Sequence, residues 1–344
     1  MDYQEFLCVV EKKMNQRLKG GITASIHIAV KNNGRIKKGI MIENPKVNIS
    51  PTIYLEEFYG RFQKGESMEH IVCDLIDFYE AVKYEESWDT SKVERYEAIQ
   101  DKIVYKIIHT EENKELLREI PHIDMLDLSV VFYILLEVKK DGTATMLIRK
   151  EHLEIWGVEE EELFPLACKN AQRILPARLF MMKEIVEEIL NPEFKEPQNV
   201  LDLPELFQRG RIREEKNIRG LSEETTEMTE IGGREQEGKV KGREEEEDMP
   251  DVMFVLTNSC RSYGAACLLY PDIMEVIGTM MGENFYILPS SIHELILVPQ
   301  SKGLSKPEME ELVKEVNETQ VKDEDQLSEH VYYYDKEIKK LFIL

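Results

Sequence analysis

Two short turns, each between runs of alternating apolar and polar residues, constrain the fold of this chain most strongly. The first turn contains Asn32-Asn33-Gly34 and the second contains Asp141-Gly142. Residues of these types tolerate the positive φ angles that a tight hairpin turn requires. We therefore expect a β-hairpin at each turn, and hairpins build antiparallel sheets.

Between and after the hairpins, apolar residues recur every three or four positions, which is typical of amphipathic helices. Such helices are expected over residues 3–19, 67–85 and 305–321, with a pair broken at Gly157. Hairpins that alternate with helices indicate an α+β protein with mostly antiparallel sheets.

Three more segments are interpreted as helices because their apolar spacing also fits. One begins at Pro51 with Ser50 as its cap, one covers 91–108, and one covers 178–190. Ser is a favoured cap and Pro is favoured in the first helical turn.

Residues 192–250 differ in kind from the rest of the chain. Residues 209–251 hold 14 acidic residues, nine basic residues, six glycines and no aromatic residue. Such a segment buries too little apolar surface to offset the ~1–2 kcal/mol per residue that backbone ordering costs. We expect a disordered acidic insertion, in which the carboxylates of 244–248 are solvated charge, a weak cation binder or a nucleic-acid mimic.

This insertion suggests the domain organisation. We expect a helix–hairpin–helical region over 1–125, and a hairpin with helices over 126–191. After the linker of 192–250, an α+β region over 251–344 is expected to pack with 126–191. Strand patterns in that region surround a turn near 288–294 and form a closing hairpin at the end of the chain.

Charge excludes some partners. The formal net charge is −23, from 67 acidic and 44 basic residues, so the surface repels phosphate backbones and anionic lipid. The best basic cluster, Arg209, Arg211 and Arg213, is followed at once by Glu214 and Glu215. We expect no nucleic acid and no membrane as partner, and a protein partner instead.

Cysteine usage and the N-terminus favour the cytoplasm. Five scattered cysteines form no CxxC pair and leave one over, which indicates reduced thiols rather than a disulfide framework. The first residues lack the basic start and apolar core of a signal peptide, and no apolar run approaches the ~18 residues of a membrane span.

Two blocks, "LIRKEHLEIWGVEEEELFPLACKNA" and "FVLTNSCRSYGAACLLYPDIMEVIGTMMGENFYILPSSIHELILVP", carry a family resemblance. They resemble an uncharacterised group of Firmicutes proteins known only as a domain of unknown function, and more distantly the YtpQ-type family. The likeness covers roughly residues 126–180 and 252–300. In the YtpQ-like pattern the two blocks are nearly continuous, which implies that 192–250 is an insertion. The resemblance implies no activity, cofactor or catalytic residue.

Ser290, His293 and Glu294 lie close together in the sequence and raise the question of a hydrolase site. A nucleophilic serine needs a base within hydrogen-bond reach and a third group that orients that base. His293 and Glu294 are adjacent, so on a strand their side chains point to opposite faces. We interpret the segment as a turn between strands, with Asp272 or Glu275 as the alternative partner of the serine.

Asn258, Ser259, Arg261 and Ser262 follow a strand pattern and precede a helix pattern, which makes them a candidate ligand-binding turn. Backbone N–H groups at a helix start favour an anion, and Arg261 adds positive charge. No phosphate-binding glycine motif occurs here. The alternative is that the small residues from Gly264 onward allow close packing on the sheet.

His70 and Cys73 are spaced three apart on a helix, near Asp74 and Asp77. A zinc site needs two further ligands from elsewhere, so we interpret Cys73 as a core cysteine and expect no metal and no cofactor.

No complete catalytic set emerges from these residues. We therefore expect a non-enzymatic binding or regulatory protein, and a hydrolase that uses the turns at 258–264 and 289–294 is the alternative.

Overall fold

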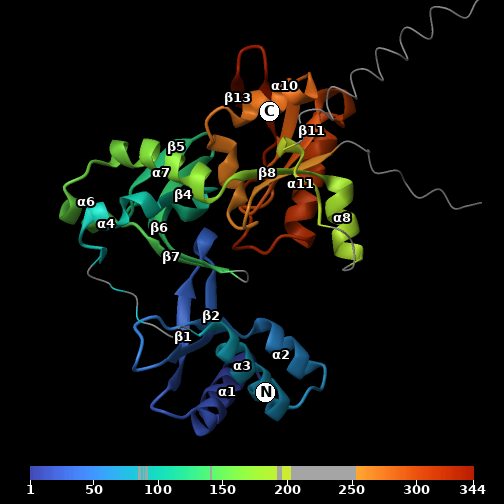
Figure 1. Ribbon diagram of the computed structural model, residues 1–344. Helices are drawn as coiled ribbons and strands as arrows, with labels where there is room; N and C mark the ends of the chain where they lie inside the picture. Colours follow the sequence, from blue (N-terminus) through green and yellow to red (C-terminus); the bar gives the residue numbers. More distant parts are fainter. Residues whose placement is uncertain (84–86, 88, 90–91, 140–141, 192–195, 203–252) are drawn as a thin grey trace, which may run out of the picture. The chain divides into compact units, whose positions relative to one another are not determined.

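The computed structural model spans residues 1–344 and describes residues 1–83, 87, 89, 92–139, 142–191, 196–202 and 253–344. It confirms the α+β class, because the described strands form three sheets of antiparallel pairs with helices between them (Figure 1). The insertion predicted at 192–250 lies almost entirely outside the described residues, and so does Asp141 of the second hairpin turn. Residues 196–202 are described, and Val200 among them is buried.

The chain divides into two compact units. The first comprises Met1–Asp101, His109–Pro121 and Arg149–Glu159. The second comprises Lys102–Ile108, His122–Ile148 and Glu160–Leu344. Each unit is therefore assembled from segments that are separated in the sequence.

The first unit opens with a helix, a three-stranded sheet and two further helices. Their bounds are α1 Tyr3–Arg17, β1 Thr23–Val30, β2 Ile36–Glu43, β3 Thr52–Tyr54, α2 Glu56–Gln63 and α3 Met68–Val82. The strand order is β1-β2-β3 with antiparallel pairs. Its other elements are short: α4 Tyr96–Ile99, η3 Gln100–Lys102, η4 Glu111–Asn113, α5 Lys114–Leu117 and α6 Lys150–Trp156.

Local hydrogen bonds and residue types define where these elements begin and turn. Asp2 and Glu5 form a capping box at the start of α1, and Ser67 caps α3 by accepting from the His70 N–H. The first hairpin turn, η1 Asn32–Gly34, places Asn33 at φ 58° and Gly34 at φ 63°. The predicted turn of the first hairpin is confirmed, since residues that tolerate positive φ occupy it.

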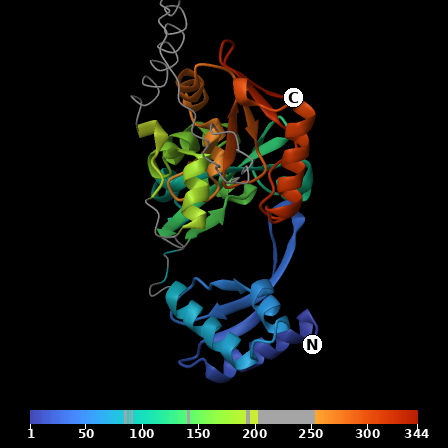
Figure 2. The ribbon, with the colours of Figure 1, turned by 90° about the vertical axis from the view of Figure 1, so that its right-hand side faces the viewer.

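The core of the first unit lies between its sheet and helices α1 and α3, which pack next to one another (Figure 1). Four apolar positions of α1 that recur every three or four residues are buried: Phe6, Leu7, Val10 and Met14. The β1–β2 hairpin extends past the ends of these helices (Figures 1 and 2).

The second unit contains two sheets. One has the order β13-β12-β10-β11-β9-β8, and in the other β6 pairs with β4, β5 and β7. The strand bounds are β4 Ile103–His109, β5 His122–Met125, β6 Leu128–Lys139, β7 Gly142–Leu147, β8 Ala177–Met181, β9 Phe254–Asn258, β10 Phe285–Leu288, β11 Leu295–Pro299, β12 Tyr332–Asp335 and β13 Lys340–Ile343.

Helices complete the second unit. Their bounds are α7 Glu160–Ile174, α8 Met182–Leu190, α10 Ile273–Met281 and α11 Lys306–Thr319, with short turns η5 Val200–Asp202, η6 Gly264–Leu269 and η7 Gln300–Lys302. Ser305 and Glu308 form a capping box on α11, and Gly282 ends α10 at φ 78°.

Three predicted helices are wrong in part. Residues 103–109 form β4 instead of a helix, because a run of β-branched residues buried on both faces favours a strand. Residues 52–54 pair with β2, so α2 starts only at Glu56 and Ser50 is not its cap. Residues 177–181 pair with β9 before α8 begins.

Gly264 lies where η6 closely approaches β9 and the turn at 289–294. A Cβ at this position would lie 2.1 Å from Thr257 Oγ1, 2.5 Å from the His293 carbonyl oxygen and 2.8 Å from the Asn258 nitrogen. Real Cβ atoms do not approach other atoms so closely, and two of the three obstacles are backbone atoms. The site therefore accepts only glycine.

We predict that Gly264→Ala lowers the free energy of unfolding by at least about 2 kcal/mol, because the methyl group overpacks the junction of η6 with β9. Gly60→Ala is the matched control, since no atom lies within 4 Å of its added Cβ on α2. That control should be neutral or stabilise by up to ~1 kcal/mol through helix propensity. Urea denaturation of both variants measures the difference, and equal effects would contradict the packing argument.

Candidate functional site

Asn258, at the end of β9, holds the loop that follows it. Its Nδ2 donates to the Ser262 carbonyl at 2.8 Å, and its Oδ1 accepts from the backbone N–H groups of Cys260 and Ser262 at 3.1 and 3.4 Å. The Ser259 N–H donates to the Pro176 carbonyl oxygen, and the Arg261 N–H donates to the Asn258 carbonyl oxygen. All four N–H groups from 259 to 262 thus bond within the protein.

Arg261 is held by its own neighbours. Its Nη1 lies 2.7 Å from Glu188 Oε2, and the guanidinium stacks over the Phe180 ring at 5.1 Å. Arg261 and Tyr263 have φ angles of 49° and 53°, in the left-handed region that side chains disfavour. The loop is therefore a strained backbone that surrounding bonds keep in place.

His293 joins this loop to two other segments. Its Nδ1 accepts the Tyr263 backbone N–H at 3.2 Å, and its Nε2 lies 3.2 Å from Asp325 Oδ1. The ring also stacks on the Tyr263 ring, with centroids 5.5 Å apart. Because Nδ1 accepts, the neutral ring carries its proton on Nε2 and donates it to the carboxylate. Both ring nitrogens are engaged.

The turns at 258–264 and 289–294 lie side by side. Thr257 Oγ1 donates to the His293 carbonyl at 2.8 Å, and the Ala265 N–H donates to the Ile292 carbonyl at 3.3 Å. Across the described residues, however, no hydrogen bond links the Ser290 hydroxyl or Glu294 to the His293 ring. The structure brings the two turns together without aligning a serine on the imidazole.

Within the part of the chain that the structure describes, neither alternative carboxylate hydrogen-bonds to the Ser290 hydroxyl. Glu275 pairs with Lys339 at 2.5 Å, and Asp272 occupies a left-handed position at the start of α10. The catalytic and ligand-binding residues named from the sequence remain predictions.

Sequence reasoning missed a second cluster of polar side chains, centred on Asp127 in the turn between β5 and β6. Its carboxylate accepts from Ser328 Oγ at 2.6 Å, from His330 Nδ1 at 3.0 Å and from the Tyr332 hydroxyl at 2.5 Å. The three donors lie about 200 residues later, on the segment that leads into β12. No local sequence signal joins positions so far apart.

The hydrogen bonds around Asp127 connect its partners in a different order from those of a catalytic triad, and they hold the β5–β6 turn in place. A hydrolase places the serine on the imidazole and the imidazole on the carboxylate. Here Ser328 donates to the carboxylate itself and accepts the His330 backbone N–H at 3.0 Å. Burial by itself would raise the pKa of Asp127, but hydrogen bonds from Ser328, Tyr332 and His330 outweigh burial and hold that pKa below its ordinary value.

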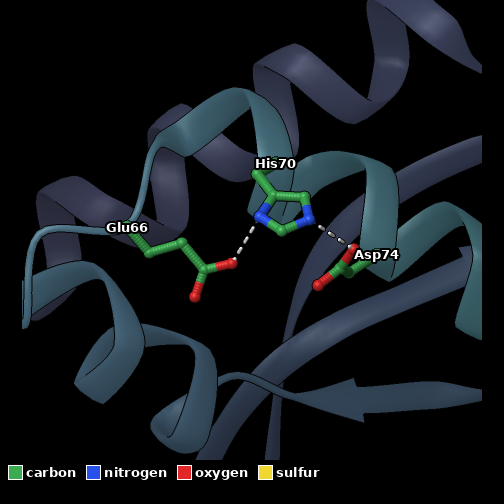
Figure 3. A group of neighbouring side chains, drawn as sticks. All are labelled: Glu66, His70 and Asp74. Atoms are coloured by element: carbon green, nitrogen blue, oxygen red, sulfur yellow. Dashed lines mark ion pairs between the residues drawn. The ribbon is translucent and has the colours of Figure 1, made fainter.

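A third cluster lies on the first unit, where His70 stands between two carboxylates (Figure 3). Its Nδ1 is 2.8 Å from Glu66 Oε1, and its Nε2 is 3.6 Å from Asp74 Oδ1. The donor atoms lie within 4.8 Å of one another, as ligands of one metal ion would. The two ring nitrogens nevertheless face different carboxylates, so only one of them could bind the same ion.

Arg61 already supplies the cation in this cluster. Its guanidinium bonds both Glu66 oxygens, at 2.6 and 2.7 Å, and also bonds Asp74. The hydrogen bonds from Arg61 lower the pKa of Glu66 and that of Asp74. A metal ion would have to displace the guanidinium, so the arrangement favours an ion-pair network.

Cys73, interpreted above as a core cysteine, is exposed, and that interpretation is wrong. The buried stripe of α3 consists of positions 71, 72 and 75, which leaves position 73 on the outer side of the helix. Its Sγ accepts from Arg17 Nη1 at 2.9 Å.

The β1–β2 hairpin exposes an apolar strip formed by Ile28, Val30 and Ile36. Their exposed fractions are 59%, 75% and 67%. The register pairs Val30 with Ile36, so the strip is continuous across the two strands on the face that α1 covers nearer the base. Residues 23–42 also hold four basic residues and no acidic residue, in a chain of net charge −23.

The chain belongs to a family of unknown function, DUF5688, whose model matches residues 3–336. Comparisons with curated proteins and with solved structures returned no match. Among the helices that the structure describes, none combines the length and apolar character needed to cross a bilayer.

We predict that Asp127→Asn lowers the free energy of unfolding by about 1–3 kcal/mol at pH 7, because three donors lose a charged acceptor. The folded-state pKa of Asp127 is depressed, so this stabilisation is present above the ordinary Asp pKa of about 3.9 and is lost as pH falls through the folded value. Unfolding curves from pH 7 to pH 3 measure the effect.

Glu337→Gln is the control, because that side chain is 81% exposed. It should change stability little at any pH. A deficit of the Asp127 variant that stays constant down to pH 3 would show that the charge contributes nothing.

Proposed function

We propose that this chain is a binding or regulatory protein of the bacterial cytosol rather than an enzyme, and that its partner is another protein. The apolar strip of Ile28, Val30 and Ile36 carries the proposal. Single exposed aliphatic residues are ordinary on a protein surface, whereas contiguous ones mark interaction sites. Burial of this strip by a partner contributes ~25 cal/mol per Å² of apolar surface removed from water.

The state of the polar side chains also favours binding over catalysis. His293 engages both ring nitrogens, and Asp127 accepts three hydrogen bonds from side chains that hold its turn in place. A general base needs a free nitrogen or oxygen within reach of a substrate proton. These groups instead stabilise the second unit.

The free cysteines and the negative net charge support the proposed compartment and the proposed class of partner. All five cysteines are free, which supports a reducing cytosol, and the net charge of −23 argues against nucleic acid and anionic membranes as partners. The likeness of residues 126–180 and 252–300 to Firmicutes and YtpQ-type proteins supports a bacterial origin.

The second candidate is a hydrolase, favoured by one observation: the turns at 258–264 and 289–294 lie side by side. It requires His293 to release the Tyr263 N–H, so that Nδ1 becomes a base. His293→Phe would abolish turnover of a panel of ester substrates if this candidate were right, and absence of any turnover by the wild-type chain would end it.

We predict that affinity capture from native bacterial lysate with the full-length chain recovers one protein at stoichiometric level, identified by mass spectrometry. The double variant Val30→Thr/Ile36→Thr should recover at least about tenfold less, because the strip loses its apolar side chains. Thr keeps the strand propensity, so the hairpin still folds.

Ile338→Thr is the control, since Ile338 is 55% exposed in the turn between β12 and β13 and belongs to the second unit. It should capture as the wild type does. Equal capture by the double variant, or no stoichiometric protein with the wild type, would overturn the proposed function.

A further inference from the structure

The outer edge of β1 is not covered by any other strand in the described sheet, because the strand order is β1-β2-β3. Lys31 N donates to Arg35 O at 2.7 Å, which makes these opposite residues a hydrogen-bonded pair. Bonded and non-bonded pairs alternate along an antiparallel ladder. Val30 and Ile36 are therefore a non-bonded pair, and the backbone groups of Val30 point away from β2.

The same alternation turns the backbone groups of Ala24, Ile26 and Ile28 outward, and helix α1 shows this directly. Asn15 accepts from the Ala24 N–H at 2.8 Å and donates to the Ala24 carbonyl at 2.7 Å. Glu11 Oε1 accepts from the Ile26 N–H at 3.0 Å. Side chains of α1 thus close the edge as far as Ile26.

Beyond Ile26 the edge is open. Within the described part of the chain, no hydrogen bond reaches the outward backbone groups of Ile28 or Val30. The two side chains are 59% and 75% exposed. An exposed edge of unpaired N–H and C=O groups is a template for a further strand.

The hairpin is held at its tip as well as at its base. The Asn33 N–H donates to Asn113 Oδ1 at 2.8 Å, and Asn113 Nδ2 donates to Asn33 Oδ1 at 2.9 Å and to the His109 carbonyl at 2.8 Å. Both asparagines are buried. The open edge between these anchors is therefore pre-organised, which lowers the entropy lost when a partner binds.

The two faces of the hairpin differ in chemistry at the open edge. The apolar strip lies on one face, while Lys31 and Lys37 lie on the other, with their Nζ atoms 4.3 and 5.6 Å from the Tyr54 ring centroid. A strand added beside β1 meets the aliphatic side chains of Ile28 and Val30 on one face and Lys31 on the other, since side chains alternate along a strand. Lys37 and Lys38 lie on β2, one strand further in, and add positive charge to the hairpin; Lys38 is opposite Ile28 on the apolar face.

We propose that the Ile28–Val30 edge of β1 takes an extended, acidic segment of a partner protein as an added strand. This inference rests on the proposed function and names how the partner is held. The bound segment alternates apolar side chains, which cover the strip, with carboxylates that pair with the lysines. A second copy of this chain is disfavoured as occupant, because it would bring two lysine-rich hairpins together.

The test uses the full chain and a fluorescent nine-residue peptide that alternates valine with glutamate. Anisotropy titration should show saturable binding that weakens with added salt. Val30→Pro removes one outward N–H without breaking the β1–β2 ladder, and should weaken binding about tenfold, the fold-change of one hydrogen bond. Val30→Thr retains the N–H and loses only part of the apolar surface, so it should bind more tightly than Val30→Pro does.

A peptide methylated on alternate backbone nitrogens tests the same point on the wild-type chain, whatever the folding of the proline variant. It should bind at least about tenfold more weakly, as should a peptide with lysine in place of glutamate. Equal binding by either peptide, no binding by the valine–glutamate peptide, or a dimer dissolved by Val30→Pro would overturn the addition of an acidic partner strand. Strip-dependent capture from lysate would still stand in those cases, so failure of the two proposals is distinguishable.

Discussion

The β1–β2 hairpin carries an apolar face that is longer than the helices that cover its base. The proposed role of this chain depends on the part of that face that stays exposed. Near the base, Ile40 and Ile42 are fully buried beneath α1 and α3. Toward the tip the same face continues through Ile28, Val30 and Ile36 without cover. Exposed aliphatic surface of this kind stabilises whatever complex buries it, because water is released from it on binding.

The second unit shows the opposite arrangement, in which polar side chains are satisfied by one another. His293 links Tyr263 to Asp325, and Asp127 ties the β5–β6 turn to the segment before β12. A buried or half-buried polar group costs free energy unless it is bonded, so these networks specify how distant segments meet. These networks explain the presence of His293 and Asp127 without assigning either residue a catalytic role.

Elements with a strong local signal could be predicted from the sequence, and elements defined by pairing could not. The stripe of α1 and the positive φ of Asn33 and Gly34 follow from residue spacing and residue type. The sequence pattern at 103–109 predicts a helix where the structure has a strand, since Ile and Val at spacings of one, three and four fit both patterns. Only the burial of this segment on both faces distinguishes the strand from a helix.

By itself the sequence determined the α+β class and the hairpins, because these depend on interactions between residues a few positions apart. Tertiary structure alone decided the Asp127 cluster and the open edge of β1. Each of these depends on which segments meet across a hundred or more residues, or on where a covering helix stops. The local spacing of apolar residues carries no information on either point, so it could not distinguish a covered apolar face from an exposed one.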